Sequence, residues 1–397
     1  MRKVREMILT QGATRVVRRA GKAAGVIIVV AAVAAGMWFG VSAVRNDGND
    51  AARAGGSPLL IYSEFGRNSD TIWAAPADDP DHRTRLATID HAYEYGVVAS
   101  LSPDGERIAH TVLPVNGAAA IDAPAEVWAM DRDGRNRERL AVDADLPVAP
   151  VWSPDGSAVV FRRSDNRDSG GRFQLVSVTT SSRETTLLDT ANGVLPIGFA
   201  SDGALYFVSL SPTGTDLGVV DVPGAVASDV AHLSDDFARD WHLSPDGSRL
   251  AYLAPRQNAN NVSFGTVVLD LNAGAVAGLK ATGLSNSQSD DFNPIWRPDG
   301  NVTIGRLTRN SDEGAPVLQM ASNGGPAASP LAAPPRGFDV PLVWSSDGGY
   351  LAVRHFEGSS TTNPGRSWVN IVGVDGGRFT VSPNSDVEVL GWVDSGG

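Results

Sequence analysis

The sequence predicts an all-β protein, a seven-bladed β-propeller of four-stranded antiparallel blades that is preceded by a single transmembrane helix. Two observations predict the propeller. A turn motif close to S-P-D-G recurs along the chain, as in LSPDG, VWSPDG, HLSPDG, IWRPDG and VWSSDG, and short strand-like runs follow each copy. A third observation predicts the helix: an uncharged apolar stretch lies near the N-terminus.

The motif copies define a period of 44 to 53 residues when they are aligned on the apolar residue before each turn. Units of this length cannot bury their apolar faces alone and must stack with neighbours. Each unit holds four runs rich in Val, Leu, Thr and aromatic residues, which is the composition of a propeller blade. The aligned anchor residues are Leu101, Trp152, Phe199, Leu243, Trp296, Trp344 and Trp392. A ring of six blades is the alternative, because the turn of the last unit departs from the pattern.

The recurring turn has a local explanation. Proline presets φ near −65°, and an Asp-Gly pair tolerates the positive φ of a tight hairpin, so the motif links the first strand of a blade to the second. We therefore expect the turn aspartates to shape hairpins rather than to catalyse or bind metal. They are Asp104, Asp155, Asp202, Asp246, Asp299 and Asp347. The anchor residues are expected to pack between blades as core.

The two ends of the repeat region complement each other. The runs PLLIYSE, TIWAAP and RTRLATI match the second, third and fourth strands of a unit, whereas VEVLGWVDSGG matches a first strand. We expect these fragments to form one shared blade, which closes the ring and removes exposed sheet edges.

Composition narrows the possible functions. The chain has 42% apolar residues, 43 glycines and 24 prolines, as a turn-rich globular protein requires. It has no cysteine, which excludes disulfides and cysteine-based zinc sites. The net charge is −12, and residues 1–24 alone carry +6, so the remainder carries −18. A body this acidic repels nucleic acid, and DNA or RNA binding is not expected.

The apolar stretch at residues 25–44 is long enough to cross the ~30 Å hydrocarbon core as a helix. Basic residues precede it, so the N-terminus is expected in the cytoplasm and the repeats outside the cell membrane. A cleaved signal peptide is the alternative. The expected organisation is a basic cytoplasmic segment (1–24), a transmembrane helix (25–44), a flexible linker (45–57) and a propeller (58–397).

The motif copies NPIWRPDGNVTIG, APVWSPDGSAVVF and WHLSPDGSRLAYL resemble the propeller repeats of the TolB family. The resemblance covers residues 58–397 and implies a propeller fold. TolB propellers are periplasmic modules that bind the peptidoglycan-associated lipoprotein, and similar repeats form the propellers of prolyl-oligopeptidase-type peptidases. The chain departs from both. TolB has a small α/β domain before its propeller, and the peptidases add a hydrolase domain with a G-x-S-x-G motif that is absent from this sequence.

Metal and phosphate motifs such as H-E-x-x-H and the P-loop are also absent, so no cofactor is expected, although a divalent cation in the channel stays possible. Acidic and aromatic residues lie at or just before the start of the first strand in several units. In a propeller, the loops at this position converge on the central axis. Such a rim would favour a cationic peptide, a basic protein tail or a divalent cation. The alternative is that the acids only solvate exposed loops. The candidate rim residues are Glu94, Asp145, Asp240, Asp290, Asp291, Asp339, Asp386, Phe237, Phe292 and Phe338, with Tyr93 and Tyr95 beside them.

These observations favour a non-catalytic module that binds an envelope protein or a basic peptide outside the cell membrane. A second hypothesis is a propeller enzyme, a lactonase-like or lyase-like hydrolase with a metal held by channel carboxylates. A third is a sensor whose ectodomain signals through the N-terminal tail of 24 residues.

Overall fold

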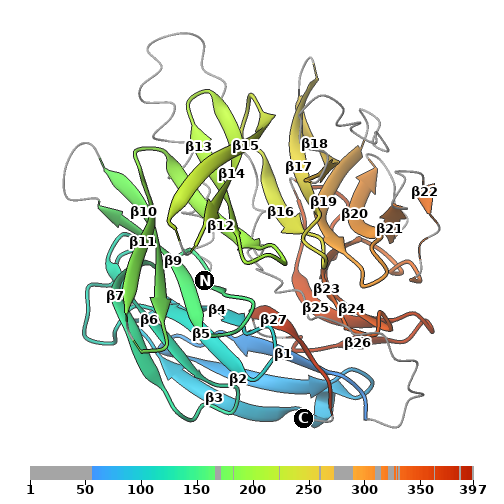
Figure 1. Ribbon diagram of the computed structural model, residues 1–397. Helices are drawn as coiled ribbons and strands as arrows, with labels where there is room; N and C mark the ends of the chain where they lie inside the picture. Colours follow the sequence, from blue (N-terminus) through green and yellow to red (C-terminus); the bar gives the residue numbers. More distant parts are fainter. Residues whose placement is uncertain are drawn as a thin grey trace.

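The computed structural model describes residues 56–395, apart from 166–170, 182, 223, 259–260, 272–288, 309–313, 321–325, 328, 330, 362 and 384–385. Seven antiparallel sheets stand around a common centre (Figure 1). Among the described residues, no helix is long and apolar enough to cross a membrane. The predicted transmembrane segment, residues 25–44, lies outside the described residues.

The first four blades each contain four described strands. Blade one consists of β27 (Val387–Val393), β1 (Leu59–Glu64), β2 (Ser69–Pro76) and β3 (Thr84–Asp90), with the 3-10 helix η1 (Pro80–His82) before β3. Blade two consists of β4 (Val98–Leu101), β5 (Arg107–Val112), β6 (Pro124–Asp131) and β7 (Glu138–Asp145). Blade three consists of β8 (Val151–Trp152), β9 (Ala158–Asp165), β10 (Arg172–Thr179) and β11 (Glu184–Thr190). Blade four consists of β12 (Gly193–Phe199), β13 (Leu205–Ser211), β14 (Gly214–Asp221) and β15 (Val226–Ser234).

The remaining three blades follow the same order, and in blade five three strands are described. Blade five consists of β16 (Arg239–Leu243), β17 (Arg249–Asn258) and β18 (Asn261–Asp270). Blade six consists of β19 (Ser289–Trp296), β20 (Val302–Thr308), β21 (Val317–Met320) and β22 (Pro326–Ala327). Blade seven consists of β23 (Phe338–Trp344), β24 (Tyr350–Phe356), β25 (Ser367–Gly373) and β26 (Arg378–Thr380).

The ring closes through the shared blade that the sequence predicts. Strand β27 pairs antiparallel with β1, so that Val393 lies opposite Leu59 and Val387 lies opposite Glu64. Figure 1 shows the C-terminal strand β27 beside β1 of the N-terminal part. The prediction of seven blades is confirmed, and the six-bladed alternative is wrong because every predicted unit forms its own sheet.

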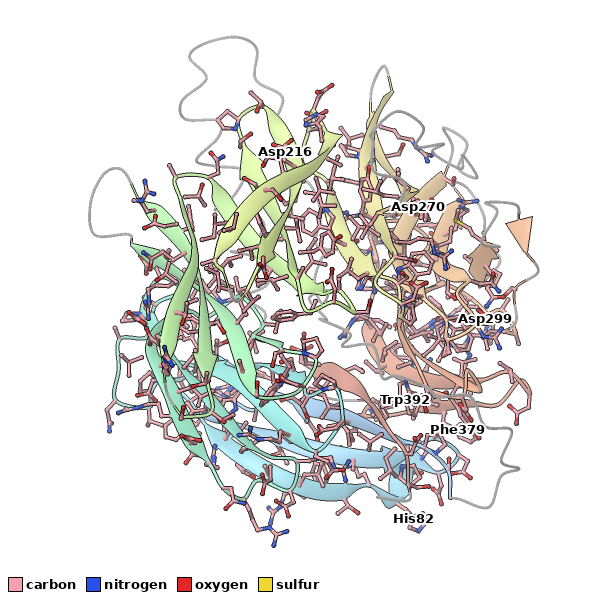
Figure 2. The ribbon with its side chains drawn as sticks, in the orientation of Figure 1. His82, Asp216, Asp270, Asp299, Phe379 and Trp392 are labelled. Atoms are coloured by element: carbon pink, nitrogen blue, oxygen red, sulfur yellow. The ribbon has the colours of Figure 1, made fainter. Side chains whose placement is uncertain are left out.

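The anchor tryptophans join neighbouring blades by hydrogen bonds as well as by packing. In three of the four anchor tryptophans the indole N–H donates to the carbonyl just before the anchor of the preceding blade: Trp152 to Ser100, Trp296 to His242 and Trp392 to Val343. The indole N–H of Trp344 donates instead to Thr303 Oγ1 in blade six. The bond from Trp392 joins blade one to blade seven, and this residue is labelled in Figure 2 between the strands of these two blades. Arginine guanidiniums also lie over the rings of Trp152 and Trp296. The anchors are therefore interblade core, as their apolar character predicts.

The recurring turns owe their shape to serine, aspartate and glycine. In the first copy, Ser102 Oγ donates to Asp104 Oδ1, which also accepts the N–H of Glu106, and Gly105 has a φ of 73°. The turn role of Asp104 is confirmed, and Asp155, Asp246 and Asp347 accept equivalent bonds. Of the Asp-Gly pair only the glycine has positive φ, because the aspartate side chain closes the turn from an ordinary backbone conformation.

Candidate binding face

The strand order gives the propeller two faces. We call the turn face the one formed by the hairpins between the first and second strands of each blade, such as residues 102–105 and 345–348. We call the loop face the opposite one, formed by the connections from the last strand of one blade to the first strand of the next, such as 91–97 and 235–238, and by those between second and third strands. A rigid scaffold that holds many loops on one face is a common basis for binding sites.

More than half of the exposed large apolar side chains among the described residues lie on the loop face. Seven large hydrophobic residues are exposed among the described residues, and four of them lie on this face: Tyr93, Val115, Phe237 and Val262. Tyr93 and Phe237 are the two aromatic members, with 53% and 54% of their surface exposed. The other three are Val142 and Val226 on outer strands and Val374 on the turn face. Exposed aromatic residues are typical of protein interfaces.

A buried ion pair supports the loop that carries Tyr93. Asp70 is fully buried, and its carboxylate accepts the backbone N–H groups of Gly66 and Val97 and the Nε2 atom of His91 at 3.0 Å. His91 Nδ1 lies 2.8 Å from the carbonyl of Ala92. Both ring nitrogens therefore face oxygen acceptors, an arrangement that only the imidazolium form satisfies. Burial opposes this charge, but the bonds to Asp70 and Ala92 outweigh it and raise the pKa of His91.

This pair predicts a pH dependence. A histidine whose pKa is raised in the folded state adds stability that is complete below its unfolded pKa, about 6.5, and is lost as the pH rises through its folded pKa. We expect the stability advantage of the wild-type protein over His91→Gln to shrink as the pH rises above that value. Urea unfolding of both proteins in detergent between pH 6.5 and 9 measures the difference.

His110→Gln is the matched control. His110 is also buried, but burial lowers its pKa to about 3, so it stays neutral in the folded protein. The effect of His110→Gln should therefore be constant between pH 7.5 and 9. A constant difference for His91→Gln over the whole range from pH 6.5 to 9 would contradict the imidazolium assignment.

Three of the predicted rim carboxylates are bonded inside the blades. Asp291 is fully buried and accepts hydrogen bonds from Arg306 Nε at 2.7 Å and from the backbone N–H of Thr266 at 3.0 Å. Asp339 lies between His355 and Arg378, and Asp145 accepts bonds from Arg162 and Ser164. These acids hold strands together, so their charge is largely compensated within the protein.

The predicted rim aromatics divide into core and surface. Phe292 and Phe338 are buried, and their rings stack with centroids 5.4 Å apart. The ring of Phe338 also stacks on that of Phe356, with centroids 5.0 Å apart. Their placement on an exposed rim is corrected, because these rings fill the space between blades six and seven. Phe237 is exposed and contacts Trp241 edge-on at 6.2 Å.

Of the four remaining acids predicted for the rim, three lie at the loop face, whereas Asp240 is buried and its placement on an exposed rim is corrected. Glu94 is partly exposed and has a φ of 64°, and its backbone N–H donates to the carbonyl of Arg67. Asp386 is exposed, and Asp290 is partly exposed and accepts the N–H of Phe264. The structure thus keeps Glu94, Asp290, Asp386 and Phe237 at the surface.

A network of buried polar side chains joins the first strands of blades five and six. His242 Nε2 donates to Asn293 Oδ1 at 2.8 Å, and Asn293 Nδ2 donates to the Pro341 carbonyl at 2.6 Å, which links three blades. Asp240 is 8% exposed, and burial raises its pKa although Arg239, His242 and the Asn293 N–H oppose this shift. Burial lowers the pKa of His242.

Asp240 and Asn293 occupy the same place in their blades, three residues before the anchors Leu243 and Trp296. Both have positive φ, 56° and 37°, at a point where the strand register shifts. The other five blades have apolar residues at this position: Val98, Ala149, Pro196, Pro341 and Val389. The polar pair is therefore local to blades five and six. Sequence reasoning missed Asn293, although comparing positions relative to the anchors would have singled it out.

In the part of the chain that the structure describes, no group of three or more His, Asp or Glu side chains is arranged to hold a metal ion. The cluster around Asp240 contains two such side chains, those of Asp240 and His242. Its third member, Asn293, has an amide where a metal site would need another acid or histidine.

Comparison with solved structures finds propeller proteins. Prolyl oligopeptidase B from Galerina marginata is 12% identical over 88% of this chain and 52% of its own, with a TM-score of 0.57. An oligogalacturonate lyase in complex with manganese is 13% identical over 83% of this chain and 86% of its own, with a TM-score of 0.53. These likenesses show the fold alone.

TolB from Acinetobacter baumannii is 18% identical over 68% of this chain and 64% of its own, with a TM-score of 0.45, which is too low to support an argument about function. The chain spans about half to two thirds of the length of this TolB and of the oligopeptidase. No protein-family model matches the sequence, and no curated protein matches it either.

Proposed function

We propose that the chain is a membrane-anchored, non-catalytic propeller that binds a protein or peptide of the cell envelope through its loop face. The observation that carries the proposal is that four of the seven exposed apolar side chains among the described residues, Tyr93, Val115, Phe237 and Val262, lie on that face, with both exposed aromatic residues among them. The predicted membrane segment at residues 25–44 supports the anchor and the extracytoplasmic location.

The pairing of the carboxylates supports binding rather than catalysis. Acid–base or metal chemistry needs groups that can reach a substrate, whereas Asp145, Asp291 and Asp339 are bonded to arginine, histidine, serine and threonine side chains. The loop face offers aromatic and aliphatic side chains next to exposed acids such as Asp236 and Asp235, the latter also in contact with His232. A peptide with apolar and basic side chains fits this surface best.

One observation favours the propeller-enzyme hypothesis. The pKa of Asp240 is raised and that of His242 is lowered, both chiefly by burial, and such opposed shifts in neighbouring groups occur in acid–base sites. A lactonase-like or lyase-like activity would therefore depend on Asp240, whereas binding at the loop face would not.

Substitution of Phe237 tests the proposal. An envelope protein is first captured with the full chain in detergent and identified, and its affinity is then measured for Phe237→Ala and Tyr93→Ala. Loss of an aromatic anchor at an interface costs about 2 kcal/mol or more, so we expect each dissociation constant to rise about 30-fold.

Two control variants make the result specific. Val226→Ala removes an exposed apolar side chain away from the loop face, and Asp240→Asn alters the buried polar pair. Both should leave the affinity unchanged. Equal affinity for the wild-type protein and Phe237→Ala would exclude Phe237 as an anchor of the interface. Loss of binding only in Asp240→Asn would instead assign the binding site to the buried polar pair.

A further inference from the structure

One buried carboxylate holds both ends of the connection between blades one and two, residues 91–97. Asp70, on β2, binds His91 Nε2 at one end of the connection and accepts the backbone N–H of Val97 at the other, at 3.0 and 2.9 Å. Its Oδ1 atom also accepts the N–H of Gly66, in the hairpin between β1 and β2. Loss of the bond to His91 would therefore free one end of the connection while the other end stays tied.

Within this connection, Tyr93 stands on a strained turn. The N–H of Tyr95 donates to the carbonyl of Ala92 at 3.0 Å, and Tyr93 and Glu94 lie between them. Glu94 has a φ of 64°, a left-handed conformation that residues other than glycine rarely adopt and that persists only where surrounding contacts enforce it. One such contact is the bond from the Glu94 N–H to the carbonyl of Arg67, at 2.7 Å.

The imidazole ring of His91 supplies a second contact. Its Nδ1 atom lies 2.8 Å from the carbonyl of Ala92, the same carbonyl that closes the turn, while Nε2 binds Asp70. The residue is 1% exposed and its ring stacks on Phe65, so solvent does not compensate for a lost bond. A neutral imidazole has one N–H and one lone pair, so it can keep only one of the two bonds. Deprotonation therefore releases either the carbonyl of the turn or the carboxylate that anchors the connection.

Asp70 is the charged side chain that faces the ring, from β2. Although burial opposes the charge of the ring, the bonds to Asp70 and Ala92 raise the pKa of His91 above its ordinary value. The other charged residues in the described segments around this pair lie at or near the surface, where solvent screens their effect on a buried ring. They are Arg67 in the hairpin, Glu94 in the connection, Asp90 at the end of β3, Asp122 in blade two and Asp386 before β27.

We propose that His91 is a pH-sensitive switch for the turn that presents Tyr93. While both ring nitrogens carry protons, the turn is closed, and Tyr93, with 53% of its surface exposed, has one fixed position on the loop face. When the ring loses a proton, residues 92–95 open locally while the seven blades stay intact. This inference rests on the binding module proposed above and adds a regulation of its loop face. A partner that docks on Tyr93 binds more weakly as the pH rises.

Hydrogen exchange of the full chain in detergent tests the switch. Mass spectrometry follows the peptides that cover residues 91–98, with the turn of blade seven, residues 345–350, as an internal reference. Protection factors for 91–98 should be constant below about pH 6.5, fall by up to about tenfold per pH unit above it, and level off above the pKa of His91 in the folded protein. Those for 345–350 should stay constant between about pH 5.5 and 9.

Two variants make the result specific to the ring. His91→Gln has no titrating ring, so its protection at 91–98 should already be low at about pH 6 and should not depend on pH. His110→Gln is the matched control, because burial lowers the pKa of His110 to about 3, and its loss should leave the pH response of 91–98 unchanged.

Two results would overturn the switch. One is constant protection of 91–98 in the wild-type protein over the whole pH range. The other is a fall in parallel with 345–350, which would mean that deprotonation opens the whole ring rather than the turn. The measurement needs no partner, so its outcome is independent of whether an envelope protein is captured through Phe237.

Discussion

A chain that stops after Ser382 is expected to lose cooperative folding, which is the largest effect that the structure predicts. The truncation removes β27, the pairing partner of all six residues of β1, and the Trp392 bond to blade seven. It also deletes four buried aliphatic side chains, Val387, Val389, Leu390 and Val393. At about 1.5–3 kcal/mol each, their burial alone contributes about 6–12 kcal/mol, comparable to the total stability of a typical domain.

Chemical unfolding followed by circular dichroism measures this effect, and size-exclusion chromatography detects aggregation through the opened edge of β1. Deletion of residues 1–24 is the control, because it removes more residues without touching a described strand. A truncated chain that unfolds with the same midpoint as the full chain would contradict the closure of the ring through β27.

Replacement of Asp291 by alanine is expected to cause the second largest effect. Its buried carboxylate accepts two bonds from Arg306, at 2.7 and 3.1 Å, and two from Thr266, at 3.0 and 3.1 Å. Without it the Thr266 N–H loses its acceptor, and Arg306 loses the carboxylate that compensates its charge. Breaking a buried pair in this way costs about 3–5 kcal/mol of unfolding free energy.

A graded series separates charge from hydrogen bonding. Asp291→Asn keeps an acceptor for Thr266 and removes the charge, so its loss of stability should lie between those of the wild-type protein and Asp291→Ala. Asp235→Ala changes an exposed acid and should leave the urea midpoint unchanged. If Asp291→Ala and Asp235→Ala had the same midpoint, Asp291 would not be the structural group described above.

The ring architecture could be predicted from the sequence because its signals are local and repeated. Most turns carry an Asp-Gly pair at a fixed step after the anchor, and four of the seven also have proline before the aspartate, so alignment of seven short segments is enough to count blades. The predicted split of the shared blade between Leu59 and Val393 follows from counting strands at the two ends. The transmembrane helix stays a prediction, because residues 25–44 lie outside the described residues.

The candidate site was harder to predict because partners that are distant in sequence decide whether an acid is available. Asp291 and Asp386 look alike as residues entering a first strand, yet Arg306 and Thr266 enclose only the former. Phe292 and Phe237 differ in the same way, since a ring from blade seven covers only Phe292. Asp70 and His91 are 21 residues apart and belong to no motif, so only the fold brings them together.

The bonds between anchor tryptophans and preceding blades have a consequence for how such a chain changes in evolution. Trp152, Trp296 and Trp392 need only a main-chain carbonyl at a set place in the neighbouring blade, and main-chain carbonyls are the same in every unit, whereas Trp344 uses the side chain of Thr303. A unit copied or excised between equivalent hairpins would therefore meet a compatible acceptor on either side. Gene duplication can thus change the number of blades without requiring a new type of contact between them. Side-chain contacts such as those of Asn293, in contrast, must be established again at each blade boundary.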